Sequence, residues 1–300
     1  MFAWVATIWT GRPVLTSAFL YFAGFVVMFV IGGVSGVVTA AVPADLQVTD
    51  TYFVVAHIHY VLIGINLFAV LGALHVWFPK MTGRFLNETF GKWAFGIVFF
   101  GFNLAFLPMH WTGLLGMPRR IYTYPAGLGW ETPNLITTVG AFVLAFGILL
   151  FLINVFGSLR NGQLAGPNPW DAPSLEWSTP SPPPPYNFPV VPRIASRHPL
   201  WESRLGERSR RSELRVGLVL DRGKEALATT ALDAVPDAIL KMPDDTPAPF
   251  IVTLAMSVGF AGLLLQVWWL AGAGAIAVLA GLLVWLWPER ELGQRAGTTT

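Results

Sequence analysis

The sequence predicts an all-α polytopic membrane protein, and its composition indicates this class directly. Hydrophobic residues make up 54% of the 300 residues, charged residues make up only 12%, and the mean hydropathy is +0.58. Soluble domains carry about 25% charged residues, which is twice the share found in this chain. The sequence contains no cysteine, so a metal site in it must use histidine, carboxylate or backbone oxygen ligands.

Four membrane spans are expected in residues 1–158. Residues 1–9 are too short to cross a bilayer and are interpreted as the last turns of a helix. Small residues at 31–36 favour close helix contact in the first span, and the loop after it contains two carboxylates and no cation. At the ~20-residue length that a spanning helix needs, the expected spans are 16–42, 51–77, 92–115 and 134–157, with loops at 43–50, 78–92 and 116–132.

The composition changes after residue 158. Residues 159–248 form a Pro- and Arg-rich segment that is expected to be cytoplasmic, with an extended proline run at 180–185. Within it, residues 226–241 are predicted to form a short amphipathic helix at the surface. Residues 249–288 are predicted to form an additional transmembrane hairpin that turns at 271–274, and residues 289–300 form a cytoplasmic tail.

The distribution of positive charge predicts the orientation of the spans. With the 10–13 loop, the 78–92 loop, the long polar segment and the C-terminus on one side, that side holds every Lys and Arg except Arg119 and Arg120. The positive-inside rule makes this side cytoplasmic. The arginine-rich stretch at 204–222 is then expected to bind anionic lipid or a partner subunit, and no nucleic acid.

Two histidines in the second span are the strongest candidate for a functional site. Because a helix turns ~100° per residue, His57 and His59 face opposite sides and cannot chelate one metal together. Buried imidazoles in hydrocarbon are costly unless they have a partner. Two interpretations stay open on the pair alone: each histidine is an axial ligand of a different haem, or both form hydrogen bonds to neighbouring helices.

Arg119 and Arg120 break the charge rule, and adjacent guanidiniums on the outer side require an anion. Haem propionates are one candidate, because Arg binds carboxylates through bidentate, charge-assisted hydrogen bonds. Lipid phosphates, or the carboxylates of Asp45 and Asp50, are the alternative partners. Asp50, with Asp45 nearby, could also bind a divalent cation such as Mg²⁺, which prefers oxygen ligands; solvated loop carboxylates are the simpler interpretation.

The three other histidines carry weaker signals. His110 is expected to be a hydrogen-bonding core residue, although metal ligation is the alternative. His75 is expected to lie at the membrane interface and His198 in solvent.

A series of motifs now resembles one family, subunit I of the haem–copper terminal oxidases, in the cytochrome c oxidase branch. The agreement covers about residues 1–160 in order and spacing, and stretches of the polar tail resemble the end of bacterial forms. The motifs are DTYFVVAHIHYVL at 50–62, WFP at 77–79, PMH at 108–110, GMPRR at 116–120, GPNPWDAP at 166–173 and RHPLW at 197–201.

The resemblance implies roles for the candidate residues. His57 would be the proximal ligand of the high-spin haem at the oxygen-reducing centre, and His59 an axial ligand of the low-spin haem. Arg119 and Arg120 would hold haem propionates, with Asp45 near one of them. Asp50 would lie at a magnesium site, where the family commonly has His at the position of Thr49; this departure puts magnesium binding in question.

The resemblance also implies cofactors and partners. We expect part of a twelve-helix bundle in a bacterial cell membrane, two haems of the a type, copper in the full subunit, and subunits II and III as partners. Cytochrome c would be the electron donor of this proton-pumping oxidoreductase, which reduces oxygen to water.

The chain resembles the family only from the end of its eighth helix onward. The copper-ligating histidines, the second low-spin ligand and both proton-uptake paths precede that point, so the chain is expected to need the remaining part of subunit I for activity. Quinol oxidase and nitric oxide reductase of the same superfamily are the first alternatives. A haem-free structural membrane protein, in which His57 and His59 are packing groups, is the second.

Overall fold

The computed structural model of the chain describes residues 1–184, 188, 194, 196–202, 225–232, 235–241 and 245–287. The predicted arginine-rich stretch at 204–222 lies outside the described residues. The described residues belong to two compact units, one formed by Met1–Pro183 with Ser196–Glu202 and the other by the rest of the chain.

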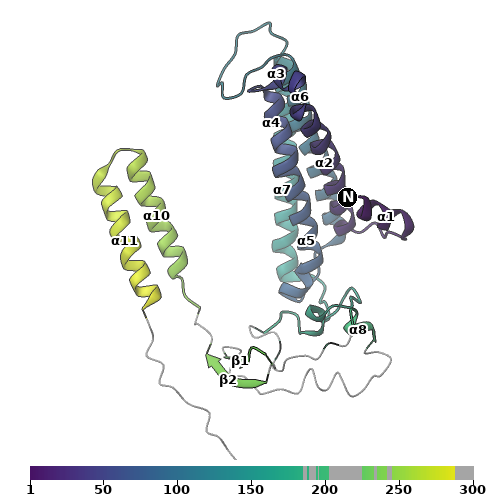
Figure 1. The fold of residues 1–300 in the computed structure, drawn as a ribbon, viewed down its shortest axis with the longest axis vertical. Coiled ribbons are helices and arrows are strands. Elements are labelled where there is room, and N and C mark those ends of the chain that lie inside the picture. The colour runs from purple at the N-terminus through teal and green to yellow at the C-terminus, as the bar shows by residue number, and fades with distance from the viewer. Residues whose placement is uncertain are drawn as a thin grey trace, which may run out of the picture. The chain divides into compact units, whose positions relative to one another are not determined.

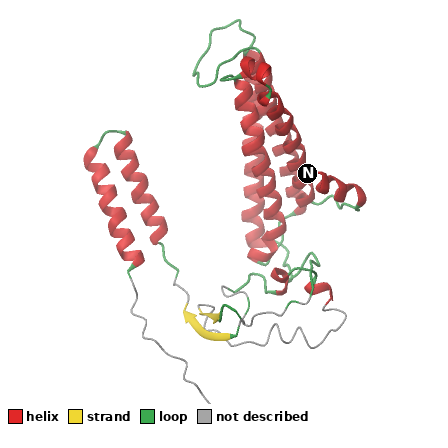
Figure 2. Ribbon diagram, viewed as in Figure 1, coloured by secondary structure: helices red, strands yellow, loops and turns green. Residues whose placement is uncertain are grey.

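The first unit is a bundle of long helices, shown side by side in Figure 1. Small elements follow the bundle along the chain, namely the 3-10 helix η2 (Leu175–Ser178) and α8 (Pro199–Glu202). Helices account for the secondary structure of this unit (Figure 2). The helices of the bundle region are α1 (Phe2–Thr10), α2 (Ser17–Ala40), α3 (Val42–Val48), α4 (Tyr52–Ile58), the π-helix η1 (His59–Gly64), α5 (Ile65–Thr82), α6 (Glu88–Leu114) and α7 (Glu131–Asn161).

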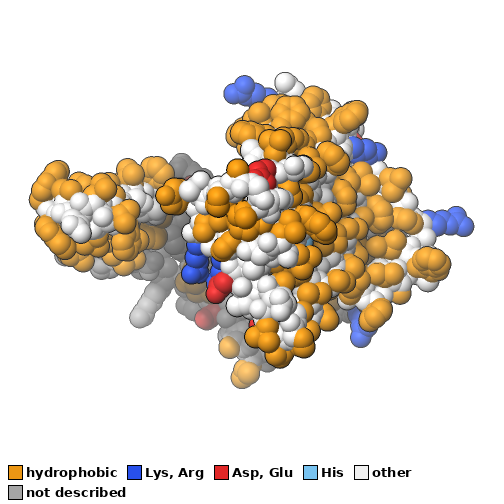
Figure 3. Space-filling view, turned by 90° about the horizontal axis from the view of Figure 1, so that it is seen from above, with side chains coloured by type: hydrophobic (Ala, Val, Ile, Leu, Met, Phe, Trp, Pro, Cys, Tyr) orange, Lys and Arg blue, Asp and Glu red, His pale blue; other side chains and the backbone are white. Residues whose placement is uncertain are grey.

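The all-α polytopic fold class is confirmed. Among the described residues, five helices are long and apolar enough to cross a membrane. They expose large hydrophobic side chains, which cover much of the surface seen in Figure 3. The five candidate spans are Ser17–Ala40, Tyr52–Thr82, Glu88–Leu114, Glu131–Asn161 and Trp268–Leu286.

The loop expected at 43–50 is largely the helix α3 instead. Pro43 lies in its first turn, where the missing backbone N–H of proline costs nothing because those donors have no partner inside a helix. The prediction of a plain loop was therefore wrong, and both of its carboxylates lie at or just after this short helix.

Aromatic side chains from α2, α5 and α6 fill the core of the bundle. Tyr21, Phe68 and Phe102 are fully buried, and their rings meet in tilted or edge-to-face pairs, which aromatic quadrupoles favour. His75 also belongs to this core. Its side chain is 5% exposed and packs against the rings of Tyr21 and Phe151.

Glycine allows α6 and α7 to pack with their backbones in contact. A Cβ on Gly140 would strike the backbone nitrogen of Ala105, and a Cβ on Gly147 would lie 2.8 Å from the backbone nitrogen of Val98. Small residues are the usual means of close helix packing in membranes, because apolar side chains gain little by leaving lipid for protein.

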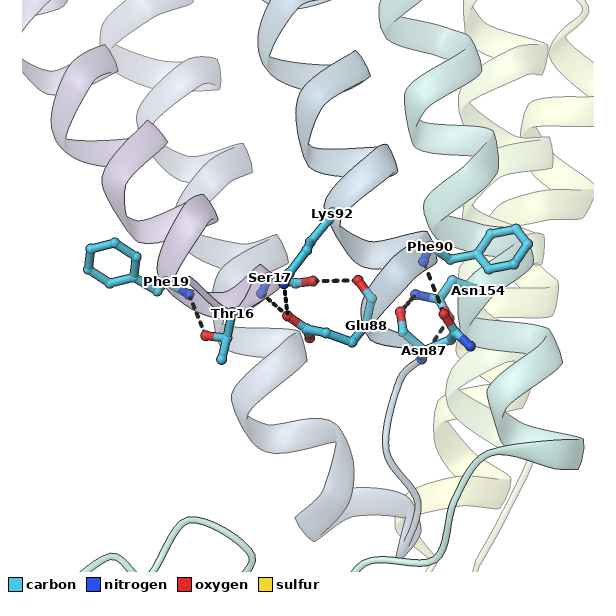
Figure 4. A network of polar contacts seen from close by, with 8 residues as sticks. All are labelled: Thr16, Ser17, Phe19, Asn87, Glu88, Phe90, Lys92 and Asn154. Atoms are coloured by element: carbon cyan, nitrogen blue, oxygen red, sulfur yellow. Dashed lines mark hydrogen bonds and ion pairs between the residues drawn. The ribbon is translucent and has the colours of Figure 1, made fainter. Parts of the chain in front are cut away.

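A polar network joins the starts of α2 and α6 to α7 (Figure 4). Glu88 accepts a hydrogen bond from the Ser17 backbone N–H at 2.6 Å and lies 3.7 Å from Lys92. The amide of Asn154 accepts from the Asn87 backbone N–H at 3.0 Å and donates to the Asn87 carbonyl at 2.9 Å. One buried side chain of α7 therefore bonds to both the backbone N–H and the backbone carbonyl of Asn87.

Lys80 fixes the polar segment that follows α7 to the end of α5. Its side chain is 5% exposed, and Nζ donates to the carbonyl oxygens of Pro167 at 2.9 Å and Thr179 at 2.8 Å. The ammonium also lies 5.4 Å from the ring centroid of Trp177, within cation–π range. Lys80 lies in the segment 78–92 that was expected to be a loop, and the structure instead buries it in the last turn of α5.

The second unit corrects two predictions. Residues 226–241 do not form an amphipathic helix; they contain an antiparallel pair of strands, β1 (Glu225–Thr229) and β2 (Pro236–Lys241), in which Leu227 pairs with Ile239. Pro236 explains the difference, because proline inside a helix removes a hydrogen bond and clashes with the preceding turn.

The hairpin of α10 (Ala248–Leu264) and α11 (Trp268–Leu286) turns earlier than predicted. The break lies at 265–267, where Gln266 adopts a left-handed conformation with φ 58°. Gly274 lies inside α11, in backbone contact with Gly259 of α10. The glycines that suggested a turn therefore serve close helix packing.

We predict that Asn154→Ala lowers the free energy of unfolding of the first unit by about 1–3 kcal/mol, because the peptide groups of Asn87 lose a buried partner. Denaturant titration of the detergent-solubilised protein measures this. Thr138→Ala is the matched control, since this exposed hydroxyl bonds to the Asn134 carbonyl of its own helix. Equal stability of the two variants would show that the amide clamp contributes nothing.

Candidate functional site

The two histidines contact different helices, as their spacing predicts. His57, near the end of α4, lies with its Nδ1 3.0 Å from Ser35 Oγ of α2. His59, at the start of η1, stacks its ring on Phe106 of α6, with centroids 4.3 Å apart and planes 17° apart. Both side chains are half-buried, and Ile58 between them is 41% exposed.

The hydrogen bond of His59 defines its tautomer. Its Nδ1 lies 2.7 Å from the Val55 carbonyl oxygen one turn earlier. A carbonyl only accepts, so Nδ1 carries the hydrogen and Nε2 of the neutral ring keeps its lone pair. Histidines that bind metals use such a hydrogen bond on the other ring nitrogen to fix their orientation, so this donor set fits an axial metal ligand.

A π-helix begins at His59 and continues to Gly64. Such wider turns are rare inside α-helices and occur often at functional sites. A π-turn contains one more residue than an α-turn. It therefore rotates every later residue of α5 about the helix axis relative to the histidines. Gly64 helps to accommodate it, because a Cβ there would lie 2.9 Å from the Phe102 ring of α6.

The start of the histidine helix is attached to the loop after α6 by backbone hydrogen bonds. The Tyr52 N–H donates to the Met117 carbonyl at 2.9 Å, and the Arg119 N–H donates to the Asp50 carbonyl at 2.9 Å. Next to these hydrogen bonds, Gly113 of α6 is in contact with the Phe53 backbone, so position 113 has no room for a side chain. The candidate arginine loop and the histidine helix therefore form one connected structure.

Arg119 forms an ion pair with the carboxylate of Asp50. Its Nε is buried and has no hydrogen-bond partner among the described residues. Asp50 is mostly exposed, while Arg120 is exposed and Asp45 half-buried, and neither of these two forms an ion pair within the described part of the chain. The unused donor of Arg119 leaves capacity for a further anion, as the propionate interpretation requires.

His110 was expected to form hydrogen bonds in the core, but both of its ring nitrogens are buried and have no hydrogen-bond partner among the described residues. His110 packs its ring against those of Phe53 and Tyr60, with centroids 5.0 and 5.6 Å away. The Tyr60 hydroxyl donates to Asn103 Oδ1 at 2.8 Å. Across the described residues, no three His, Asp or Glu side chains gather closely enough to enclose a metal ion, so Asp45 and Asp50 do not form such a cluster.

Sequence reasoning missed Ser35 of α2, whose hydroxyl lies 3.0 Å from His57 Nδ1. It lies in the small-residue stretch 31–36, which was interpreted only as a helix-packing motif. The signal available in the sequence was the Ser35 hydroxyl, which lies on the same helical face as Gly32 and Gly36.

Comparison with known proteins matches the first part of the chain to a family. Residues 1–143 match the family described as cytochrome c and quinol oxidase polypeptide I. Residues 1–143 therefore belong to this family. The histidine helix and the arginine loop both lie inside the matched residues.

Individual members are similar over most of this chain. Cytochrome c oxidase subunit 1 of Bacillus subtilis is 43% identical over 88% of the chain and 39% of its own length. Quinol oxidase subunit 1 of Bacillus spizizenii is 37% identical over 93% of the chain and 40% of its own length. The chain spans about two fifths of these relatives. A solved haem–copper terminal oxidase dimer matches with a TM-score of 0.45 and 24% identity, covering 50% of this chain and 28% of that one.

We predict that Gly113→Ala lowers the free energy of unfolding of the first unit by about 1–3 kcal/mol, because the added methyl group overlaps the Phe53 backbone and forces α4 away from α6. Gly96→Ala in the same helix is the control: nothing lies within 4 Å of its new Cβ, and alanine favours the helix by about 1 kcal/mol. Thermal unfolding of both variants tests this. A Gly113→Ala protein as stable as Gly96→Ala would contradict the proposed close contact.

Proposed function

We propose that this chain forms the C-terminal part of the catalytic subunit of a proton-pumping cytochrome c oxidase. The observation that carries the proposal is the arrangement of His57 and His59, which present imidazoles toward two different helices from one continuous helix. One helix between two metal centres brings those centres close together, which electron transfer requires.

His57 is assigned as the proximal ligand of the high-spin haem and His59 as an axial ligand of the low-spin haem. Bound haem supplies electron transfer and, together with copper, the reduction of oxygen to water. The chain contributes ligand nitrogens and their orientation: the His59 Nδ1–H is bound to Val55, which directs the Nε2 lone pair away from its own helix.

Arg119 and Arg120 are assigned to the haem propionates, with Asp45 beside one of them. The buried, unused Nε of Arg119 supports this role, since guanidinium donors bind carboxylates in pairs. Asp50 would keep Arg119 in place through their ion pair. If Mg²⁺ binds near Asp50, this carboxylate supplies one oxygen ligand and the other ligands come from other parts of the complex.

The remaining assignments concern the assembly. The chain would work with the remaining part of subunit I, which would supply the copper ligands, and with subunits II and III in a bacterial cell membrane. Residues 1–158 would be the oxidase helices, 159–248 a cytoplasmic segment, 249–288 an additional membrane hairpin and 289–300 a cytoplasmic tail.

We predict that His57→Ala, in the assembled oxidase, removes the high-spin haem and its carbon monoxide difference spectrum while the low-spin absorption remains. His59→Ala removes the low-spin absorption instead. The reason is that each imidazole is the axial ligand proposed for its haem. Reduced-minus-oxidised optical spectra measure both effects.

His198→Ala is the matched control for this pair, because His198 is exposed and its ring packs against the Trp201 ring of its own segment. Its spectrum should equal that of the unaltered protein. Unchanged haem spectra in both the His57 and the His59 variants would reject the ligand assignment and favour packing histidines.

A quinol oxidase is the second candidate, because quinol oxidase subunit 1 of Bacillus spizizenii matches 93% of the chain. We predict faster turnover of the assembled oxidase with reduced cytochrome c than with quinol, in line with the higher identity to a cytochrome c oxidase. Oxygen consumption with each donor measures this. Turnover with quinol alone would assign the quinol activity.

A further inference from the structure

Ser35 joins the His57 ring to the backbone of a neighbouring helix. Its side chain is buried, at 6% exposure. The hydroxyl oxygen lies 3.0 Å from His57 Nδ1 and donates to the Gly32 carbonyl oxygen, also at 3.0 Å. One hydroxyl therefore connects α4 to α2 at the position of the candidate ligand.

The number of hydrogens available fixes the direction of both bonds. A serine hydroxyl has one hydrogen, and the Gly32 carbonyl can only accept. Since that hydrogen is donated to Gly32, the bond between Ser35 and His57 must be donated by the Nδ1–H of the ring. His57 Nδ1–H donates to Ser35 Oγ, and the Ser35 hydroxyl donates to the Gly32 carbonyl oxygen. Nε2 of His57 therefore keeps its lone pair.

We propose that Ser35 is a positioning residue for His57, which fixes its tautomer and ring orientation and strengthens Nε2 as an iron ligand. This rests on the proposed function of His57 as an axial ligand. An acceptor on the second ring nitrogen raises the basicity of a ligating histidine. Donation onward to Gly32 polarises the serine oxygen and makes it a better acceptor, because linked hydrogen bonds reinforce one another.

The glycine after Ser35 completes the contact. A Cβ on Gly36 would lie 3.1 Å from His57 Cε1, so the bare backbone at this position lets the imidazole approach α2. The ring is held at Nδ1 by the hydroxyl and along its edge by the helix surface.

His59 is held in a different way. Its Nδ1 bonds to Val55, a residue of its own helix, so its orientation does not depend on α2. A substitution of Ser35 should therefore alter the haem bound by His57 and leave the haem bound by His59 unchanged. This difference distinguishes a positioning role from a general loss of folding.

The test compares Ser35→Thr with Ser35→Val in the assembled oxidase, because these side chains have nearly the same shape and differ in the hydroxyl. The readout is the iron–histidine stretching band in resonance Raman spectra of the reduced protein. We expect Ser35→Val to shift the band to lower frequency and to weaken high-spin haem retention by roughly 10- to 100-fold. Ser35→Thr should retain both properties, and the low-spin absorption should stay unchanged in both variants.

Thr39→Val is the matched control one turn along α2, where the hydroxyl bonds to the carbonyls of Ser35 and Gly36; its band should not move. Loss of the band in His57→Ala establishes the ligand, and an unmoved band in Ser35→Val then overturns only the role of Ser35. A band that persists in His57→Ala overturns the proposed function itself. If Ser35→Val does not assemble, Ser35→Ala gives the same comparison with the same expected shift.

Discussion

The backbone contact between α4 and α6 is the constraint on which the candidate site depends. Gly113 touches the Phe53 backbone, and hydrogen bonds from Tyr52 to Met117 and from Arg119 to Asp50 continue the attachment into the next loop. Together they fix the rotation of the histidine helix about its axis. Because that rotation decides where an imidazole points, a side chain larger than hydrogen at Gly113 would disturb residues more than a turn away.

The opposite side of the same helix is held by α2 through Gly32, Ser35 and Gly36. The histidine helix therefore lies between two neighbours, with one imidazole directed to each. In a membrane, apolar burial between helices contributes little, and close backbone contact with hydrogen bonds supplies the stability. The same residues thus serve packing and site geometry, which is why a small-residue motif concealed a hydroxyl with a chemical role.

Hydropathy predicted the long helices well, because a spanning helix needs a long apolar run whatever its neighbours are. Sequence patterns failed where one residue type can serve two structural roles. The glycines of α11 were interpreted as a turn, yet Gly274 lies against Gly259 inside the hairpin. Lys80 was placed in a basic loop, yet carbonyl groups from a distant segment surround its ammonium. Such partners are far apart in the sequence, so no local pattern reveals them.

The sequence by itself determined the polytopic helical class and the opposite directions of His57 and His59, because helical periodicity is a local property of the chain. Only the tertiary structure decided that His57 meets Ser35 of α2, that His59 meets Phe106 of α6, and that Arg119 pairs with Asp50. These choices depend on which helices approach one another and at what rotation. That is set by backbone contacts between residues tens of positions apart, where a single missing Cβ decides how close two helices can come.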